Sequence, residues 1–332
     1  MTDRAEYGLV TPVDLARMSE QVAQRLHDFL PFTPFVRFAT LSDRVGAEVL
    51  VKCEHLQRTG SFKARGSLAK LLSLTDEQRD RGVVAASSGN HGLGVAHALD
   101  LLGGRGIVFV PENVASVKVD AIRRFGVEIR SHGTDSGAVE IMARQFATDE
   151  GLTYISPYND VDVIAGQGTV GVEIAEQLAG AGLDAIFVAV GGGGLISGIA
   201  AVLRQHLPNI RVYGAAPAND AAMVASVRAG QVVGVEARPT LSDGTAGSVE
   251  PGAITLRLCQ SLVDEWVLVS EDEIRDALRF VIDTEHQLIE GAAAAAFAAA
   301  IGRSAELAGQ RVAVVSCGAN ISARTLATAL IE

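Results

Sequence analysis

Residues 83–92 read Val-Val-Ala-Ala-Ser-Ser-Gly-Asn-His-Gly, and they begin the regular alternation of strands and helices. The apolar run predicts a short strand over 83–86, and the turn after it opens a helix from about residue 92 to residue 102. Free backbone N–H groups, the hydroxyls of Ser87 and Ser88 and the amide of Asn90 meet at the start of that helix. The turn suits a carboxylate ligand, although an ordinary helix-capping cluster explains it equally well when taken alone.

The same alternation continues after this unit. We expect further strands at 107–110, 127–129 and 153–155, with helices at 116–125 and 136–148. Strands that alternate with helices of this length predict right-handed βαβ units and a parallel sheet. Residues 79–156 are therefore expected to form a small α/β domain of their own.

The pattern resumes on a larger scale on both sides of this block. Before it, we expect a helix over 11–30, which Pro31 and Pro34 end, and a strand over 48–53. After it, the expected strands are 185–190, 211–215 and 311–315, and the expected helices are 195–206, 219–229, 271–288, 292–302 and a last one at the C-terminus. The whole chain is thus predicted to be an α/β protein with two parallel-rich domains.

Composition excludes several classes of protein. The chain has 332 residues, of which 48% are hydrophobic and 20% charged, so we expect a substantial packed core rather than disorder. The net charge of −11 argues against nucleic acid or an anionic membrane as the main partner. Three cysteines without a CxxC pair argue against a disulfide framework and favour a reducing cytoplasm. We expect no signal peptide at residues 1–6 and no transmembrane segment.

Ser61-Phe62-Lys63-Ala64-Arg65-Gly66 places a lysine in an unusual position. We expect Ser61 to cap a helix and Lys63 to lie in its first turn, where the partial positive charge of the helix end disfavours a charged amine. In a dry site burial acts in the same direction, and both effects lower the pKa of Lys63 toward the neutral amine that attacks an aldehyde. A surface lysine that tolerates its position is the alternative explanation of this hexapeptide.

Two further turns follow expected strands. Gly191-Gly192-Gly193-Gly194 stands between a buried strand and a helix, so its uncovered N–H groups form a phosphate cradle. It is neither a P-loop nor a dinucleotide motif, and a glycine-rich turn needed only for packing is the alternative. Ser316 follows the last strand, and its hydroxyl either bonds a ring nitrogen or caps a helix. Because ligands of open α/β sheets bind at the carboxyl ends of strands, we expect these turns to lie together.

Four of these motifs occur in one order: Ser-Phe-Lys-x-Arg-Gly, Ser-Ser-Gly-Asn-His-Gly, Gly-Gly-Gly-Gly-Leu and a terminal Ser-x-Gly-x-Asn. Together they resemble the fold type II pyridoxal-phosphate-dependent enzymes, most closely the branch of serine/threonine dehydratase and serine racemase. Residues 164–169 (Ile-Ala-Gly-Gln-Gly-Thr) and 288–290 (Leu-Ile-Glu) also match that branch. The resemblance covers about residues 30–325.

The resemblance implies the tryptophan-synthase-beta-like fold. Its large, discontinuous cofactor-binding domain would consist of residues 1–78 and 157–332, with the small substrate-binding domain at 79–156. The implied cofactor, pyridoxal 5′-phosphate, would be bound by Phe62, Lys63, Asn90, Gly191, Gly192, Gly193, Gly194 and Ser316, and the substrate carboxylate by Ser87, Ser88, Asn90 and His91.

Individual roles also follow from the resemblance. Lys63 would form the Schiff base with the cofactor and later move the α-proton, Phe62 would pack on the cofactor ring, and Asn90 would bond its 3′-hydroxyl. Gly191–Gly194 would hold the phosphate, and Ser316 would face the pyridine nitrogen. A neutral serine there does not favour full protonation of the ring, so we expect the carbanion to expel a β-hydroxyl before it is reprotonated.

The expected function is a dehydratase that converts a 3-hydroxy amino acid of the threonine or serine type into a 2-oxo acid and ammonia. A serine or amino-acid racemase or a β-replacement synthase on the same fold is the first alternative. Ser88 is compatible with the racemase alternative, because racemases use a serine as the base on the face opposite the lysine. Dehydratases of β-hydroxyaspartate-like substrates carry this serine too, so it does not distinguish the two reactions. A pyridoxal-phosphate-binding protein without turnover is the second alternative. The resemblance also implies a homodimer.

Several residues depart from the branch. Ala216 and Ala222 stand where the racemases have acidic metal ligands, and His91 and His97 fall on different faces of a helix, so we expect no metal site. Leu93 and Gly291 replace a glutamine and a proline of the pattern, and both are expected to reshape the substrate pocket. The short segment after Asn320 leaves no room for the regulatory domain of biosynthetic threonine dehydratases, which favours a role in amino-acid catabolism.

Overall fold

The computed structural model describes residues 10–331, so the expectation of no signal peptide at residues 1–6 lies outside the described residues. The strands are β1 (Phe35–Arg37), β2 (Glu48–Lys52), β3 (Val83–Ala86), β4 (Gly106–Val110), β5 (Glu128–Ser131), β6 (Thr153–Tyr154), β7 (Ala185–Ala189), β8 (Arg211–Pro217), β9 (Glu265–Val269) and β10 (Arg311–Val315). The helices are α1 (Pro12–Leu26), α2 (Ala39–Val45), η1 (Glu54–Leu56), α3 (Lys63–Ser73), α4 (Asp76–Arg81), α5 (Asn90–Leu102), α6 (Ser116–Arg123), α7 (Ser136–Asp149), α8 (Val161–Leu178), α9 (Gly194–His206), α10 (Ala222–Ala229), η2 (Asp243–Thr245), α11 (Ile254–Leu262), α12 (Glu271–Glu285), α13 (Gly291–Gly302), α14 (Ser304–Leu307) and α15 (Ala323–Ile331).

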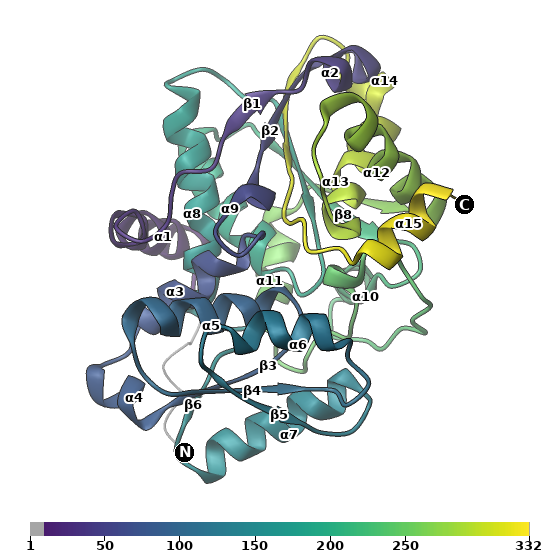
Figure 1. The fold of residues 1–332 in the computed structure, drawn as a ribbon. Coiled ribbons are helices and arrows are strands. Elements are labelled where there is room, and N and C mark those ends of the chain that lie inside the picture. The colour runs from purple at the N-terminus through teal and green to yellow at the C-terminus, as the bar shows by residue number, and fades with distance from the viewer. Residues whose placement is uncertain (1–9, 332) are drawn as a thin grey trace.

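The strands form two sheets, which lie in the upper and lower parts of Figure 1. The larger has six strands in the order β1-β2-β10-β7-β8-β9, and the smaller has four in the order β5-β4-β3-β6. Every pairing is parallel except that of β1 with β2. This architecture confirms the predicted α/β fold with parallel-rich sheets.

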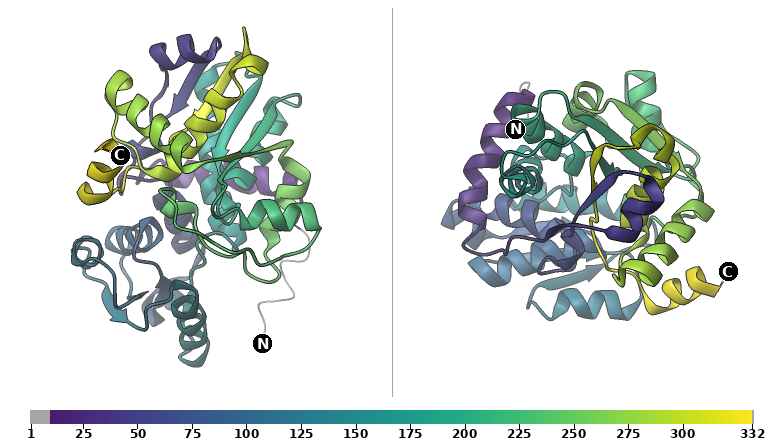
Figure 2. Two further views of the ribbon diagram at one scale, coloured as in Figure 1. Left: turned by 90° about the vertical axis from the view of Figure 1, so that its right-hand side faces the viewer. Right: turned by 90° about the horizontal axis from the view of Figure 1, so that it is seen from above.

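Burial on both faces explains why the central strands are continuous apolar runs. All five residues of β7 are buried, and so are four of the five in β10. The helices α1, α8 and α9 pack together on one side of the six-stranded sheet, and α12 and α13 lie on the other side (Figures 1 and 2). Strands β3 and β10 have the bounds that the sequence predicted.

Four expected helices are shorter in the structure: 116–125 ends at Arg123, 219–229 begins at Ala222, and two more end early. The helix expected over 11–30 ends at Leu26, residues 27–30 form turns, and Leu30, directly before Pro31, is disfavoured in helical conformation. The helix expected over 271–288 ends at Glu285, where His286 adopts a left-handed conformation with φ of 55°. All of these corrections concern helix ends, where the apolar pattern carries little information.

Helix α8, the longest among residues 10–331, was not predicted. It is buried on almost every side, so its sequence lacks an amphipathic pattern, and its glycines lower its helix propensity. The glycines permit close helix contacts: a Cβ on Gly166 would lie 2.7 Å from the Cα of Gly66, and a Cβ on Gly198 of α9 would lie 2.6 Å from the nitrogen of Gly168. The pattern also missed β1, α2, α11 and β9.

The four-stranded sheet, with α5 and α6 above it and α7 below it in Figure 1, contains residues of the proposed small domain. Helix α3 lies outside residues 79–156, yet its Leu68 and Leu71 share a hydrophobic core with Val83. The boundaries at 79 and 156 therefore stay a prediction. None of the helices within residues 10–331 has both the length and the apolar character that a membrane span requires.

Candidate active site

Lys63 is the first residue of α3, as expected, but Ser61 does not cap this helix. The residue before the helix is Phe62, and it makes no side-chain capping hydrogen bond. Ser61 is instead held in an antiparallel bridge with Gly318, and its buried hydroxyl has no hydrogen-bond partner among the described residues. The bridge keeps the backbone of Ser61 extended, one position too early for a cap.

The Lys63 amine lies in surroundings that favour its neutral form. Its Nζ donates to the carbonyl oxygen of Pro157 at 2.8 Å and lies 5.2 Å from the centre of the Phe62 ring. Burial lowers the pKa of Lys63 to about 8, although the acidic groups of Cys317, Glu290 and Glu140 act in the opposite direction. At pH 7 the neutral fraction of this amine is therefore far larger than that of an ordinary lysine.

The glycine loop connects β7 to α9 and leaves no room for side chains. Gly193 has a φ of 83°, which favours glycine, and α9 begins at Gly194. A Cβ on Gly192 would lie 2.3 Å from the Tyr158 ring, and a Cβ on Gly191 would lie 2.7 Å from the carbonyl oxygen of Thr245. The loop thus presents bare backbone at the positive end of a helix, which fits a phosphate.

The Ser87-Ser88 turn lies at the carboxyl end of β3, and α5 begins at Asn90. Ser87 and Ser88 are half-buried, and the Ser87 hydroxyl accepts from the backbone N–H of Gly89 at 3.1 Å. The His91 ring is buried, and its Nε2 lies 2.9 Å from the carbonyl oxygen of Ile155. Burial and then the nearby Lys63 lower the pKa of His91 to about 3, so its imidazole is neutral and brings no charge to a carboxylate.

The site contains a buried carboxylate, Glu290, to which the sequence pattern assigned no role. Asn90 donates from its amide to both Glu290 oxygens, at 2.9 and 3.1 Å. The backbone N–H of Asn320 donates to the same carboxylate at 3.0 Å, and its amide donates to Asn90 Oδ1 at 2.6 Å. Burial raises the pKa of Glu290 to about 7, and the Asn90 bonds oppose this shift. Its match to the family pattern was the only signal in the sequence that could have identified it.

Ser316 immediately follows β10, and its hydroxyl is fully buried without a hydrogen-bond partner among residues 10–331. The next residue, Cys317, accepts from the backbone N–H of Phe62 at 3.1 Å, which joins this turn to the start of α3. An unpartnered buried hydroxyl beside Phe62 and Lys63 is what a ring nitrogen would satisfy. The donors present therefore fit a pyridine ring with a phosphate.

The segment after β6 brings the glycine loop to Lys63. Pro157 accepts from the Lys63 amine, and the next residue, Tyr158, lies with its ring against Gly192 and with its backbone and Cβ against Gly194. The turns after β3, β7 and β10 are therefore joined near Lys63, where the Asn90–Glu290 bond and the Phe62–Cys317 bond also lie. The predictions missed Pro157 and Tyr158, because a proline after a short strand is also typical of an ordinary loop.

A buried network of charges fixes the start of α3. Arg65 donates to Glu54 at 2.7 Å and to Glu173 of α8 at 2.6 Å, and Lys52 of β2 lies 2.5 Å from Glu173. All of these side chains are almost fully buried, and their formal charges cancel, as buried ion pairs require. This network explains why an arginine stands two residues after Lys63.

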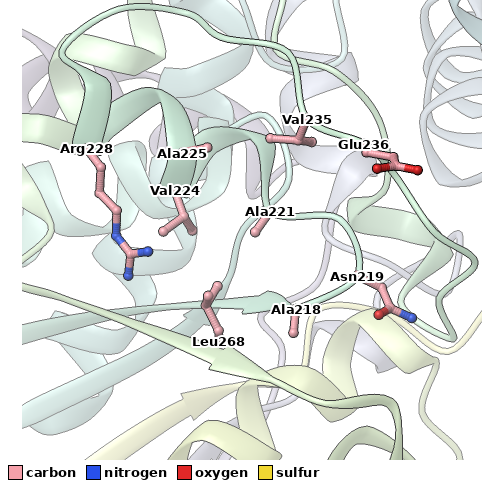
Figure 3. Close-up of a pocket in the computed structure, with 9 residues that line it drawn as sticks. All are labelled: Ala218, Asn219, Ala221, Val224, Ala225, Arg228, Val235, Glu236 and Leu268. Atoms are coloured by element: carbon pink, nitrogen blue, oxygen red, sulfur yellow. The ribbon is translucent and has the colours of Figure 1, made fainter.

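Figure 3 shows a groove of about 180 Å³ on another part of the surface, lined by Ala218, Asn219, Ala221, Val224, Ala225, Arg228, Val235, Glu236 and Leu268. None of the predicted site residues contributes to it. Among residues 10–331 there is no group of three or more histidine, cysteine, aspartate or glutamate side chains arranged for a metal. His97 packs edge-on against Phe125 instead of facing His91. The expectation that no metal binds stays a prediction.

A family model described as pyridoxal-phosphate dependent enzyme matches residues 27–318. The chain belongs to this family. It is 39% identical over 300 residues to the L-threonine ammonia-lyase of Thermotoga maritima, covering 90% of this chain and 74% of that protein. It is 40% identical over 286 residues to the catabolic L-threonine dehydratase of Escherichia coli, covering 86% and 85%.

Solved structures give the same result. The processed threonine deaminase isoform 2 of Solanum lycopersicum superposes with a TM-score of 0.90 at 33% identity, covering 96% of this chain and 87% of that one. The serine racemase of Dictyostelium discoideum superposes with a TM-score of 0.85 at 32% identity, covering 94% and 100%. These matches confirm the predicted family branch, the fold type II architecture and pyridoxal phosphate as the cofactor of this pyridoxal-phosphate-dependent enzyme.

Proposed function

We propose that this enzyme is an ammonia-lyase that removes water from a 3-hydroxy amino acid of the threonine or serine type and releases a 2-oxo acid and ammonia. The observation that carries the proposal is the Lys63 amine: burial lowers its pKa to about 8, and its hydrogen-bond acceptor, Pro157, precedes the tyrosine that packs on the bare glycine loop. The names of the relatives, threonine ammonia-lyase and threonine dehydratase, support the same reaction.

The residues that would hold the cofactor come from three turns. Gly191–Gly194 would bind the phosphate through backbone N–H groups, and the Ser316 hydroxyl would bond the ring nitrogen. Phe62 would cover the ring, and Asn90 would bond the phenolic oxygen. When bound, pyridoxal phosphate supplies an electron sink for the electron pair that remains after an α-proton is removed.

Lys63 would carry two functions in turn. Its neutral amine would hold the cofactor at its aldehyde group, and the same amine, when free, would take the α-proton of the substrate. The substrate carboxylate would be bound at the start of α5 by Ser87, Ser88, Asn90 and His91. Because the His91 ring is neutral and bonded to Ile155, its backbone N–H is the group available for this contact.

Elimination would break the bond between the β-carbon and its hydroxyl, and the hydroxyl would leave as water with one proton, which the α-proton taken up by Lys63 balances. The neutral Ser316 hydroxyl does not favour a protonated ring, so the electron pair of the broken C–H bond is used to expel the β-hydroxyl. The released enamine takes up water outside the reaction step and gives the 2-oxo acid and ammonia.

Racemisation of serine or a related amino acid is the second candidate. Ser88 is half-buried at the end of β3, and a hydroxyl there would act as the base on the face opposite Lys63. The similarity to the serine racemase of Dictyostelium discoideum supports this candidate. For either reaction we propose a location in the cytoplasm, in keeping with the three buried free cysteines, and a homodimer, for which the family resemblance is the only support.

The deciding experiment measures 2-oxo acid release and the chirality of the remaining amino acid over L- and D-serine, threonine, 3-phenylserine and 3-hydroxyaspartate. We expect oxo acid from at least one 3-hydroxy substrate, and loss of both the imine absorption band and turnover in Lys63→Ala. A Lys63→Ala variant that keeps the band and full activity would show that the lysine is misassigned. Ser88→Ala should remove racemisation while elimination continues, and unchanged racemisation would remove Ser88 from the mechanism.

A further inference from the structure

Arg144 and Glu250 form one of the ion pairs that join the part of the chain around the four-stranded sheet to the part around the six-stranded sheet; Lys118 and Asp243 form another. Arg144 of α7 places its Nη2 2.6 Å from the Oε2 of Glu250, which lies between η2 and α11. The same guanidinium bonds Glu140 within α7 at 2.8 Å and lies 4.3 Å from the centre of the Tyr154 ring. In Figure 1, α7 belongs to the lower part and α11 to the upper part.

Glu250 is connected to the glycine loop through Tyr158. Its backbone N–H donates to the Tyr158 hydroxyl at 2.8 Å, and the Tyr158 ring lies directly on Gly192. The residue before Tyr158 accepts the hydrogen bond of the Lys63 amine. An unbroken series of contacts therefore leads from Arg144 of α7 to the glycine loop and Lys63.

The carboxylate of Glu250 depends on Arg144. Burial raises the pKa of Glu250, and the charge of Arg144 is the strongest effect that opposes this rise. The Oε1 atom of Glu250 is buried and has no hydrogen-bond partner among the described residues. Without Arg144, the carboxylates of Glu140 and Glu250 would face each other with no cation between them, which favours separation of the two parts.

We propose that Arg144 is a positioning residue: it holds Glu250, and through it Tyr158, so that the ion pair between the two parts and the shape of the glycine loop depend on each other. This arrangement would order the groups that are proposed to bind the cofactor. The kinetic consequence of this role rests on the proposed function, whereas its effect on cofactor binding does not.

The test compares Arg144→Met with a matched control, Arg130→Met. Arg130 also pairs with a carboxylate, Glu128 at 2.6 Å, and also lies over an aromatic ring, Phe146 at 4.7 Å, but it makes these contacts inside the four-stranded part. We expect Arg144→Met to raise the dissociation constant of pyridoxal phosphate, measured from the imine absorption band, by roughly threefold to tenfold. KM should rise more than kcat falls, and Arg130→Met should stay within about twofold of wild type.

A double-mutant cycle isolates the pair. Glu250→Gln keeps the backbone N–H that bonds Tyr158, so we expect it to weaken cofactor binding as Arg144→Met does, with no further loss in the double variant. Additive losses, or equal losses in Arg144→Met and Arg130→Met, would overturn the proposal. If Arg144→Met does not fold, Glu250→Gln is compared with wild type instead. A cofactor affinity that is unchanged in Glu250→Gln would contradict the proposed role of Arg144. If no substrate turns over, the proposed function is wrong. The dissociation constants of pyridoxal phosphate would still show whether the Arg144–Glu250 pair supports cofactor binding.

Discussion

Lys63 and Glu290 are two ionisable side chains whose surroundings oppose their ordinary charge. Burial lowers the pKa of the lysine to about 8 and raises that of the glutamate to about 7. The glutamate also acts on the lysine, since its negative charge is one of the effects that hold the pKa of Lys63 up. Both groups therefore change protonation close to neutral pH, where an ordinary pair of this kind would be fully charged.

The raised pKa of Glu290 makes stability depend on pH in a defined direction. Between the usual value near 4.5 and the folded value near 7 the folded protein binds more protons than the unfolded chain, so its stability falls as the pH rises through this range. Replacing the group removes this contribution. We expect the free energy of unfolding of wild type, relative to that of Glu290→Gln, to fall by on the order of 3 kcal/mol from pH 4 to pH 8.

Urea unfolding at several pH values measures this difference. Glu77→Gln is the matched control, because Glu77 is exposed in the first turn of α4. The control should keep the pH dependence of the wild type. Parallel curves for wild type and Glu290→Gln over the whole range would show that the Glu290 carboxyl does not titrate near neutral pH in the folded protein.

Single residues also show where prediction from sequence ends. Lys63 was placed correctly because its position in a first helical turn follows from local order alone. The capping role of Ser61 was wrong because its bridge to Gly318 joins segments far apart in the chain. Glu290 received no role, since its contacts with Asn90 and Asn320 exist only once the two sheets face each other.

At the scale of elements, the strands were predictable and some helices were not. Strands β3 and β10 are apolar runs that burial on both faces explains, so their bounds follow from composition. Helix α8 was not predicted, because it packs through glycines such as Gly166 and Gly168, and sequence rules associate glycine with turns. The loop between β7 and α9 was predicted, because four consecutive glycines are incompatible with a stable helix and therefore indicate a turn.

That loop allows a test of the phosphate cradle. A Cβ on Gly192 would lie 2.3–2.6 Å from three atoms of the Tyr158 ring, so Gly192→Ala must displace either the ring or the loop. We expect the affinity for pyridoxal phosphate to fall by roughly tenfold or more while the fold is retained. Gly182→Ala is the control, because nothing lies within 4 Å of a Cβ there. Equal cofactor affinity in the two variants would contradict the assignment of this loop.

At the scale of the whole molecule, the candidate site lies where the two parts meet, and polar contacts join them there. They include Arg144 with Glu250, Lys118 with Asp243 at 3.4 Å, and Asn90 with Glu290. The loop that follows α10 carries two of the acidic partners, and in Figure 2 it lies between the upper and lower parts. The proposed ligands of the cofactor come from both sides, namely Asn90 on one and the glycine loop and Ser316 on the other. A bound cofactor would therefore add contacts between the two parts of the chain.

Removal of the cofactor should consequently destabilise the protein as a whole. A ligand that binds only the folded state at about a hundred times its dissociation constant adds about 2.7 kcal/mol of stability. We expect the Tm of the protein with pyridoxal phosphate to exceed that of the cofactor-free protein by several degrees.

We also expect limited proteolysis within residues 230–253 to be faster without the cofactor, because that segment carries the acidic partners of Arg144 and Lys118. Scanning calorimetry and mass analysis of the fragments measure both effects, and Gly192→Ala at the same cofactor concentration should show a smaller gain. An unchanged Tm and cleavage rate at saturating cofactor would mean that the cofactor makes no stabilising contacts between the two parts of the chain.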